Sequence, residues 1–437
     1  MPVHFGPSSN VLWQCRIPSG HSSPCVWRDR IFLTGFENEE LRILCLDRQT
    51  GRIVWQKSLP PGKLERSGRL SNPASSTQTT DGRRLFTYFG SFGLLCHDFD
   101  GQEQWRLPLP TPLTQHGASS SPVLANGLVL LLRDQDAGSH LMAVDAPTGR
   151  VAWKAERPWA RRGFSTPLVI HEGQRRLAIT AGTLRLSAYD TATGREVWST
   201  SGLPNEMCSS PVAGEGLIFA AGWTPGSGVP RMPAFETLLE GDRNKDQRIQ
   251  RDEAPNGPAR QHFHYIDADR DGTLSREEWD SMADIFNRSS NALLAVRPGG
   301  QGDVSATHVR WRQQRGLPYV PTPLYHQGRV HLVKNGGLVS CFKAATGEVL
   351  YQEERVGAIG DYYASPIAAG DRICVASQPG TLVIFEAADS LKILARNVLG
   401  EEVLATPAVV EDTLYVRTAM RLYAFKEDAA DSRGSER

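Results

Sequence analysis

One pattern of apolar and polar positions recurs along the chain. The clearest copies start near a Ser-Pro or Thr-Pro pair, continue through two apolar stretches, and end with a Thr-Gly turn followed by an aromatic residue, whereas weaker copies lack part of this pattern. The stretch SSPVLANGLVLLL leads to LMAVDAPTGRVAW, and FSTPLVIHEG leads to LSAYDTATGREVW. Short apolar runs with a turn signal about every ten residues predict β-strands joined by hairpins rather than helices.

The aromatic residue after the Thr-Gly turn marks the period of the repeat. It recurs every 40 to 50 residues in all intervals but one, a spacing typical of a four-stranded propeller blade. The marker residues are Trp13, Trp55, Trp105, Trp153, Trp198, Trp311 and Tyr351, with Ala395 in the last copy. Strand starts predict eight blades, beginning near Ser23, Ser75, Ser120, Thr166, Ser209, Thr322, Ser365 and Thr406.

The repeats therefore predict an all-β fold, an eight-bladed β-propeller of four-stranded antiparallel blades. The eighth copy lacks an outer strand, whereas VLWQCRIP at residues 11–18 has an outer-strand pattern with no blade before it. We expect this N-terminal strand to complete the last blade and close the ring. In each repeat we expect the Thr-Gly segment to form a tight turn and the following Trp to pack between neighbouring blades.

One interval is far longer than a blade, because Trp198 and Trp311 lie 113 residues apart. The excess falls between the second and third strands of blade five and predicts a small α-helical insertion. The expected domains are the propeller at 11–223 and 291–426, the insertion at 224–290, and a disordered polar tail at 427–437.

The insertion contains two twelve-residue stretches, DRNKDQRIQRDE and DADRDGTLSREE, with oxygen-bearing side chains at the spacing of a calcium loop. Calcium takes six to eight oxygen ligands, and this spacing lets a short loop surround the ion, with a bidentate Glu at the last position. In the first loop the expected ligands are Asp242, Asn244, Asp246, the carbonyl of Arg248, and Glu253. In the second they are Asp267, Asp269, Asp271, the carbonyl of Thr273, and Glu278. Both loops resemble EF-hands, so we expect calcium as the cofactor.

The two loops differ at the sixth position, where the turn needs a positive φ. The second has Gly272 there, but the first has Gln247, a strain on the order of 1 kcal/mol that predicts weaker binding. We expect Ile249 and Leu274 to pair across a short strand bridge between the loops. Helices are expected at 232–240 and 275–288, and the short link between the loops favours a compact, rigid pair.

Composition excludes several classes of function. The 48 basic and 48 acidic residues leave no net charge, so we do not expect a nucleic-acid partner. No apolar stretch reaches the roughly 18 residues of a membrane helix, and the start MPVHFGPSSN lacks the features of a signal peptide. The seven scattered cysteines are expected to be buried strand residues rather than disulfide or metal ligands. We expect a monomer.

Several segments carry a family resemblance: HSSPCVWRDRIFL, GSFGLLCHDFDGQEQW, RDQDAGSHLMAVDAPTGRVAW and LATPAVVEDTLYVRTAMRLYAF. They resemble repeats of the PQQ-like β-propeller family, in its bacterial branch of PQQ-binding-like repeat proteins. The resemblance covers about residues 11–426 outside the insertion. It implies the fold but leaves the function open, because this fold hosts dehydrogenases, assembly scaffolds and binding modules.

We predict that the insertion lies at the channel mouth, because the loop between the second and third strands of a blade emerges where the inner strands begin. Residues just before the inner strands are candidates for a site on that face. The first candidates are His21, His116, Tyr319, Asp361 and Tyr362. Further candidates are Asn72, Arg161, Arg162, Asn205, Glu206, Glu401 and Glu402.

No motif of a known catalytic or phosphate-binding site is found. We therefore favour a non-catalytic propeller that binds a protein or small ligand on the channel-mouth face. Quinoprotein oxidoreductases of the family hold pyrroloquinoline quinone and calcium on the axis against an adjacent cysteine pair. No two cysteines are adjacent here, so the quinone is not expected.

The third alternative is a scaffold that resembles the propeller lipoprotein of the outer-membrane assembly machinery, although the chain shows no lipobox. The family resemblance implies export to the periplasm or cell surface, which the missing signal peptide does not support.

Overall fold

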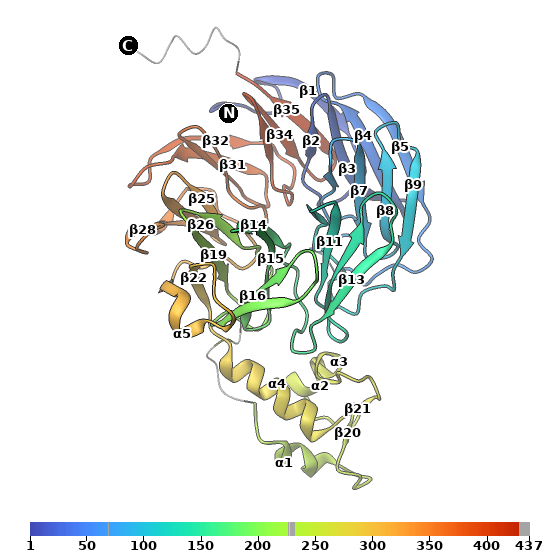
Figure 1. Cartoon of the computed structure of the whole chain (residues 1–437). Coiled ribbons are helices and arrows are strands. Elements are labelled where there is room, and N and C mark those ends of the chain that lie inside the picture. Colours follow the sequence, from blue (N-terminus) through green and yellow to red (C-terminus); the bar gives the residue numbers. More distant parts are fainter. Residues whose placement is uncertain (69, 226, 228–231, 428–437) are drawn as a thin grey trace.

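The computed structural model describes residues 1–68, 70–225, 227 and 232–427. Eight antiparallel sheets stand around a central axis, and the insertion projects from one side of the ring (Figure 1). This confirms the predicted eight-bladed propeller. None of the helices in the described part of the chain has the length and apolar character needed to span a membrane.

Within each blade the strands follow one another from the axis outward. Blades one and two contain β2 (Cys25–Trp27), β3 (Arg30–Glu37), β4 (Glu40–Asp47), β5 (Ile53–Leu59), β6 (Thr79–Thr80), β7 (Arg84–Phe89), β8 (Gly93–Asp98) and β9 (Glu103–Pro108). Blades three and four contain β10 (Val123–Ala125), β11 (Leu128–Arg133), β12 (His140–Asp145), β13 (Val151–Glu156), β14 (Leu168–Glu172), β15 (Arg175–Gly182), β16 (Arg185–Asp190) and β17 (Glu196–Ser201).

The second half of the ring repeats this arrangement. Blades five and six contain β18 (Val212–Gly214), β19 (Leu217–Gly222), β22 (Ala292–Val296), β24 (Val309–Gln313), β25 (Leu324–His326), β26 (Arg329–Lys334), β27 (Leu338–Lys343) and β28 (Val349–Arg355). Blades seven and eight contain β29 (Ile367–Ala369), β30 (Arg372–Ala376), β31 (Thr381–Glu386), β32 (Ile393–Val398), β33 (Ala408–Val410), β34 (Thr413–Arg417), β35 (Arg421–Phe425) and β1 (Val11–Arg16).

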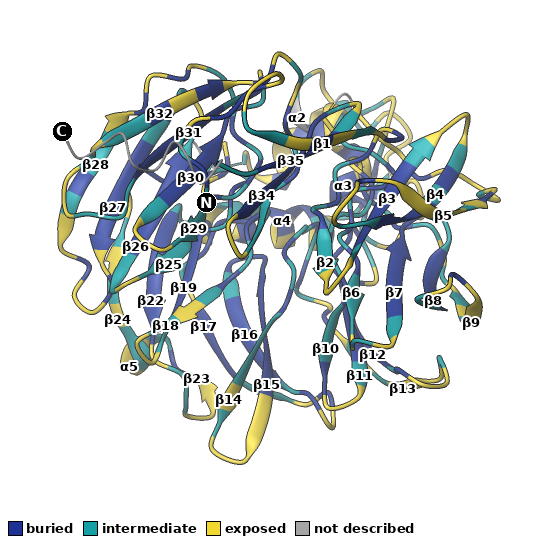
Figure 2. Ribbon diagram, turned by 90° about the horizontal axis from the view of Figure 1, so that it is seen from above, coloured by how far each residue is buried: buried dark blue, intermediate teal, exposed yellow. Residues whose placement is uncertain are grey.

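Burial follows the position of a strand in its blade. The second and third strands are buried between neighbouring sheets, whereas outer strands such as β9 and β13 alternate exposed and half-buried residues (Figure 2). In blade five a longer connection, with β23 (Gly302–Asp303) and α5 (Ser305–His308), replaces the Thr-Gly turn. Gly302 pairs with Trp198 of the neighbouring blade, and Trp198 is fully buried.

The first and last strands close the ring. Strand β1 pairs antiparallel with β35, with Trp13 opposite Ala424, as predicted. The ten residues before β1 also belong to the propeller, which corrects the predicted start at residue 11. Phe5 packs against Phe425, with ring centroids 4.7 Å apart. Glu427 accepts a hydrogen bond from the Val3 N–H at 2.7 Å, so the predicted disordered tail does not begin at 427; residues 428–437 lie outside the described part.

In five blades the Trp of the outer strand joins its blade to the next one. The indole N–H of Trp153 donates to the carbonyl of Thr191, 3.1 Å away in the Thr-Gly turn of blade four. The same bond joins Trp13 to Arg48, Trp55 to Phe99, Trp105 to Ala146 and Trp311 to Ala344. The predicted packing of Trp between blades is confirmed for these five residues.

A small residue opposite each Trp makes room for the ring. Cys45 faces Trp55, Ala143 faces Trp153, and a β-bulge follows each pair. The seven cysteines are all free, and Cys45 is fully buried. The small residue and the Trp thus form one packing unit, because a larger side chain on the third strand would displace the indole.

Gly194→Ala tests how tightly the Trp contacts the next turn. Gly194 has φ +73°, and a Cβ there would lie 2.5 Å from Trp153. We expect the free energy of unfolding in urea to fall by about 2 to 4 kcal/mol, from left-handed strain and overpacking together.

Gly173→Ala is the matched control in the same blade. Gly173 also has a positive φ, of +58°, but a Cβ there would meet nothing within 4 Å. The free energy of unfolding of Gly173→Ala should fall by about 1 kcal/mol, from backbone strain alone. Equal losses in the two variants would show that the Trp contact contributes nothing.

The insertion leaves blade five after β19 and returns at β22, between the second and third strands of the blade. It contains α1 (Phe235–Leu238), η1 (Leu239–Gly241), β20 (Ile249–Gln250), α2 (Pro258–Gln261), α3 (Phe263–Ile266), β21 (Thr273–Leu274) and α4 (Arg276–Arg288). Ile249 pairs with Leu274, as predicted. Phe235, Phe263 and Trp279 belong to an apolar core of the insertion, which Leu184 of blade four joins from the propeller.

Candidate functional site

A ring of Ser and Thr hydroxyls surrounds the axis of the propeller. Each blade contributes one of them just before its innermost strand, and for seven of the eight a backbone N–H of the preceding blade donates to the hydroxyl. Seven such bonds, of 2.9 to 3.0 Å, link the ring. Its members are Ser23, Thr77, Ser121, Thr166, Ser210, Thr322, Ser365 and Thr406. These bonds fix the hydroxyls in the wall of the axis.

The ring lines an axial cavity of about 350 Å³. Among its described lining residues there is no Lys or Arg, and the one carboxylate is Glu206. Burial, and to a smaller extent the charge of Arg417, lowers the pKa of His21 to about 4. Burial raises the pKa of Tyr319, so this phenol stays protonated. The axial cavity therefore combines hydroxyls with apolar side chains, and its described lining has no fixed positive charge at neutral pH.

A second pocket, of about 730 Å³, lies between the propeller and the insertion; we call it the vestibule. One wall comes from the propeller, and the other comes from apolar side chains of the insertion, including Leu238, Trp279 and Phe286. The vestibule and the axial cavity share His116, Glu206 and Tyr319. The two spaces therefore meet at these three side chains, which we call the junction.

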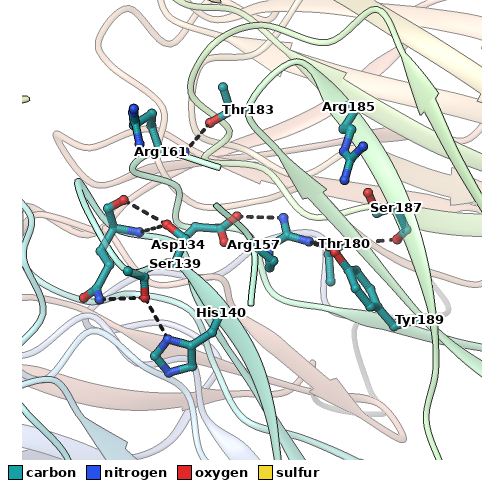
Figure 3. Close-up of polar contacts among 12 residues, drawn as sticks. Asp134, Ser139, His140, Arg157, Arg161, Thr180, Thr183, Arg185, Ser187 and Tyr189 are labelled. Atoms are coloured by element: carbon teal, nitrogen blue, oxygen red, sulfur yellow. Dashed lines mark hydrogen bonds and ion pairs between the residues drawn. The ribbon is translucent and has the colours of Figure 1, made fainter. Parts of the chain in front are cut away.

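Two buried ion pairs support the propeller wall of the vestibule. Arg157 binds Asp134 through two hydrogen bonds of 2.8 and 2.9 Å and also donates to Tyr189 at 2.8 Å (Figure 3). Arg162 binds Asp136 in the same way, at 2.8 and 3.1 Å. Both aspartates lie between β11 and β12, and both arginines lie between β13 and β14. Two ion pairs thus hold the β11–β12 connection against the β13–β14 connection.

The insertion is joined to the propeller by specific contacts. The guanidinium of Arg162 lies 4.6 Å from the ring centroid of Tyr265, at the end of α3. The side-chain oxygen of Asn205 accepts hydrogen bonds from Thr224 at 2.8 Å and from Ser289 at 3.1 Å. Since Thr224 precedes the insertion helices and Ser289 follows them, one residue of the propeller holds both ends of the insertion.

The second acidic loop brings three carboxylates together. Asp267, Asp269 and Asp271 each offer an oxygen within 4.8 Å of the others, and among the described residues no other such group of His, Cys, Asp and Glu is found. Asp267 is 5% exposed, and its Oδ1 is buried without a partner. Gly272 has φ +86°. Burial and the nearby Glu278 and Asp271 raise the pKa of Asp267.

The two predicted glutamate ligands do not lie in that group. Glu278 accepts hydrogen bonds from the Ala268 N–H at 2.7 Å and forms a capping box with Ser275 at the start of α4. Its carboxylate therefore touches the start of the loop through the backbone. Glu253 of the first loop accepts from the Gln250 N–H at 3.1 Å.

The first loop holds its acidic side chains on its own backbone. Gln247 has φ +62°, as its position requires, and its N–H donates to Asp242 at 2.9 Å. Asn244 donates to Asp246 at 2.9 Å. The Arg248 side chain forms an ion pair with Asp271 of the second loop, and Thr273 donates to the same carboxylate at 2.7 Å. The two loops are thus linked through Asp271.

The rim candidates divide into two groups. His21, His116 and Tyr319 line the axial cavity, together with Glu206. Tyr362 does not, which corrects the prediction. It is fully buried, and its hydroxyl donates to the Ala358 carbonyl at 2.7 Å.

The next residue, Tyr363, lines the cavity instead. Its hydroxyl donates to Asp361, 3.4 Å away, and Asp361 itself lies outside the lining. Adjacent residues of an extended segment point to opposite sides, so a one-residue error exchanges wall and core. Sequence reasoning also missed the hydroxyl ring, although the Ser or Thr before Pro in seven of the eight repeats was a visible signal.

The fold defines the class of this protein, an eight-bladed β-propeller. A family model described as outer membrane protein assembly factor BamB matches residues 39–169 and 137–231. None of the curated proteins matches the chain.

Solved structures share the whole fold at low sequence identity. BamB from Moraxella catarrhalis has a TM-score of 0.59 at 13% identity, covering 95% of this chain and 99% of that one. A europium-containing methanol dehydrogenase has a TM-score of 0.58 at 10% sequence identity, and the match covers 95% of this chain and 93% of that one. Quinohemoprotein alcohol dehydrogenase from Comamonas testosteroni has a TM-score of 0.57 at 13% sequence identity, and the match covers 96% of this chain and 77% of that one. The chain therefore shares the β-propeller fold of these proteins, and its match to the family model spans residues 39–231.

The buried His21 predicts a loss of stability in acid. Its pKa is about 4 in the fold and about 6.5 in the unfolded chain. The unfolded chain therefore takes up the proton first as the pH falls from about 6.5, and stability is lost down to about pH 4. Between pH 7 and pH 5, the free energy of unfolding should fall by up to about 2 kcal/mol more in the wild type than in His21→Gln. Urea unfolding at both pH values measures this difference. Equal decreases in the free energy of unfolding of the wild type and of His21→Gln would contradict the assignment of this pH dependence to His21.

Arg162→Ala tests how the insertion is held on the propeller. The stack on Tyr265 is worth about 1 to 2 kcal/mol where it is desolvated, so its loss should raise amide hydrogen exchange in α3 about tenfold. Tyr265→Phe is the control, because it keeps the ring and removes a hydroxyl that is buried without a partner. Unchanged exchange in Arg162→Ala would mean that the insertion is held by other contacts.

Proposed function

We propose that this chain is a non-catalytic binding propeller that takes a ligand or partner on the face bearing the insertion. The observation that carries this proposal is the vestibule, a pocket of about 730 Å³ with one wall from the propeller and one from the insertion. Concave pockets with apolar walls and a few convergent polar groups are typical of binding sites. The insertion thus supplies half of the site.

We further propose that calcium binds to the second acidic loop and stabilises the insertion. Asp267, Asp269 and Asp271 supply hard oxygen ligands close together, and the buried Oδ1 of Asp267 has no partner of its own. A divalent cation would offset the repulsion among these carboxylates. The loop joins α3 to α4, and Tyr265 of α3 and Trp279 of α4 both line the vestibule. Calcium would therefore hold the outer wall of the vestibule in place.

An oxidoreductase that uses pyrroloquinoline quinone is the less favoured candidate. The quinone carries three carboxylates, so a site for it needs cationic side chains. The described lining of the axial cavity includes no Lys or Arg, and it includes the carboxylate of Glu206. Cys208 is its one cysteine among the described residues. These residues do not fit the quinone.

A scaffold role is favoured by the family match and the BamB likeness. The description of the matching family names an outer membrane protein assembly factor, and such a role requires a protein partner. Under this proposal the chain acts after export, where calcium is millimolar, so that even a loop with low calcium affinity would be occupied by the ion. The vestibule would then take a segment of the partner.

A calcium titration of chelator-stripped protein by calorimetry tests the calcium part. We expect two sites, the tighter one lost in Asp267→Ala and weakened in Glu278→Gln, and Asp242→Ala should remove the weaker site. At a calcium concentration of about 100 times Kd, the stabilisation should be about 2.7 kcal/mol, seen as a higher melting temperature.

Glu277→Gln is the matched control. It removes an exposed carboxylate beside Glu278 that occupies no ligand position. If Glu277→Gln weakens binding as much as Glu278→Gln, general charge rather than a built site attracts the ion. If millimolar calcium gives neither heat nor a shift in melting temperature, the calcium proposal is wrong.

A further inference from the structure

The junction between the axial cavity and the vestibule contains an unpaired carboxylate. Glu206 lines both spaces, and no hydrogen bond or ion pair joins its side chain to any residue that the structure describes. Burial raises its pKa. Glu206 is half-buried and faces the junction without a bonded cation, so a cationic group of a ligand placed there would pair with it.

The neighbouring charges do not neutralise Glu206. Arg162 is already bonded twice to Asp136 and once to Gln115, so its charge is shared with another carboxylate. Burial, followed by the charge of Arg162, lowers the pKa of His116, so this ring is neutral at pH 7. When Glu206 is ionised, Arg162, Asp136 and Glu206 together carry a charge of −1, and no Lys is among the described residues that line either space.

We infer that the vestibule binds a small organic cation, with its ammonium group at Glu206 and its apolar body among Leu238, Trp279 and Phe286. This inference rests on the proposed binding function and names the ligand class for that site. An ammonium group is a three-fold hydrogen-bond donor. It would meet the Glu206 carboxylate and, in the axial cavity, the hydroxyl ring.

The walls favour an organic cation over a metal ion. A divalent cation wants several oxygen ligands, whereas Glu206 is the only carboxylate among the described residues shared by the two spaces. Tyr319, at the junction, adds an aromatic ring, and aromatic rings attract ammonium ions. The apolar walls beyond it suit a hydrocarbon body. An anion would face the charge of Glu206 with no free cation to offset it.

Calorimetry of the calcium-loaded protein with octylamine, octan-1-ol and octanoate tests the inference. We expect octylamine to bind at least tenfold more tightly than octanoate. Ethylamine should bind at least tenfold more weakly than octylamine, because each buried methylene contributes about 0.8 kcal/mol. Glu206→Gln should weaken octylamine binding at least tenfold and leave octan-1-ol unchanged. Glu402→Gln, which alters an exposed rim carboxylate bonded to Gln378, should change neither.

A second variant separates the two ends of the site. Phe286→Ala should weaken octylamine binding more than ethylamine binding, because the half-buried Phe286 lines the vestibule away from the junction. Binding of octanoate as tight as that of octylamine would overturn the inference, and so would an unchanged affinity in Glu206→Gln or no heat with any of these compounds. The calcium titration of the same protein decides the calcium part of the proposed function separately.

Discussion

The contact between a Trp of one blade and the turn of the next is the constraint on which the rest of the structure depends. No blade can bury both of its faces, so each sheet needs a neighbour at a defined distance. The indole of Trp153 sets that distance, because it packs under Gly194 and donates to the Thr191 carbonyl. The same contact recurs in five blades. At the axis, seven hydroxyl-to-backbone bonds link one blade to the next.

The candidate site lies where this regularity is broken. Between β11 and β12 and between β13 and β14, two Asp–Arg pairs replace simple turns, and the insertion packs against one of them through Arg162. Buried ion pairs of this kind contribute little net stability, but they specify one geometry. Asn205 then holds both ends of the insertion on the rim. The vestibule is therefore a consequence of a few polar contacts on a rigid ring.

Features with a period could be predicted from the sequence, whereas single contacts could not. The number of blades, the closing strand and the Ile249–Leu274 pair all follow from spacing. Tyr362 and Tyr363 could not be told apart, because a one-residue shift of register exchanges core and cavity. The Asp134–Arg157 pair joins two irregular connections without any repeat, so nothing in the sequence pointed to it. Residues 1–10 carry no pattern, although Phe5 packs against Phe425.

The acidic loop and the junction border the same small body, so ligands bound at the two places would be coupled through it. The second loop joins α3 to α4, both of which line the vestibule. Glu206 follows Asn205, the residue that anchors both ends of the insertion. A cation bound at the loop would restrict the movement of the vestibule wall, and a ligand at the junction would restrict the same wall from the propeller side. The second of the two to bind would therefore meet a wall that the first has already ordered. By thermodynamic linkage, the cation would raise the affinity for the ligand by the same factor as the ligand raises the affinity for the cation.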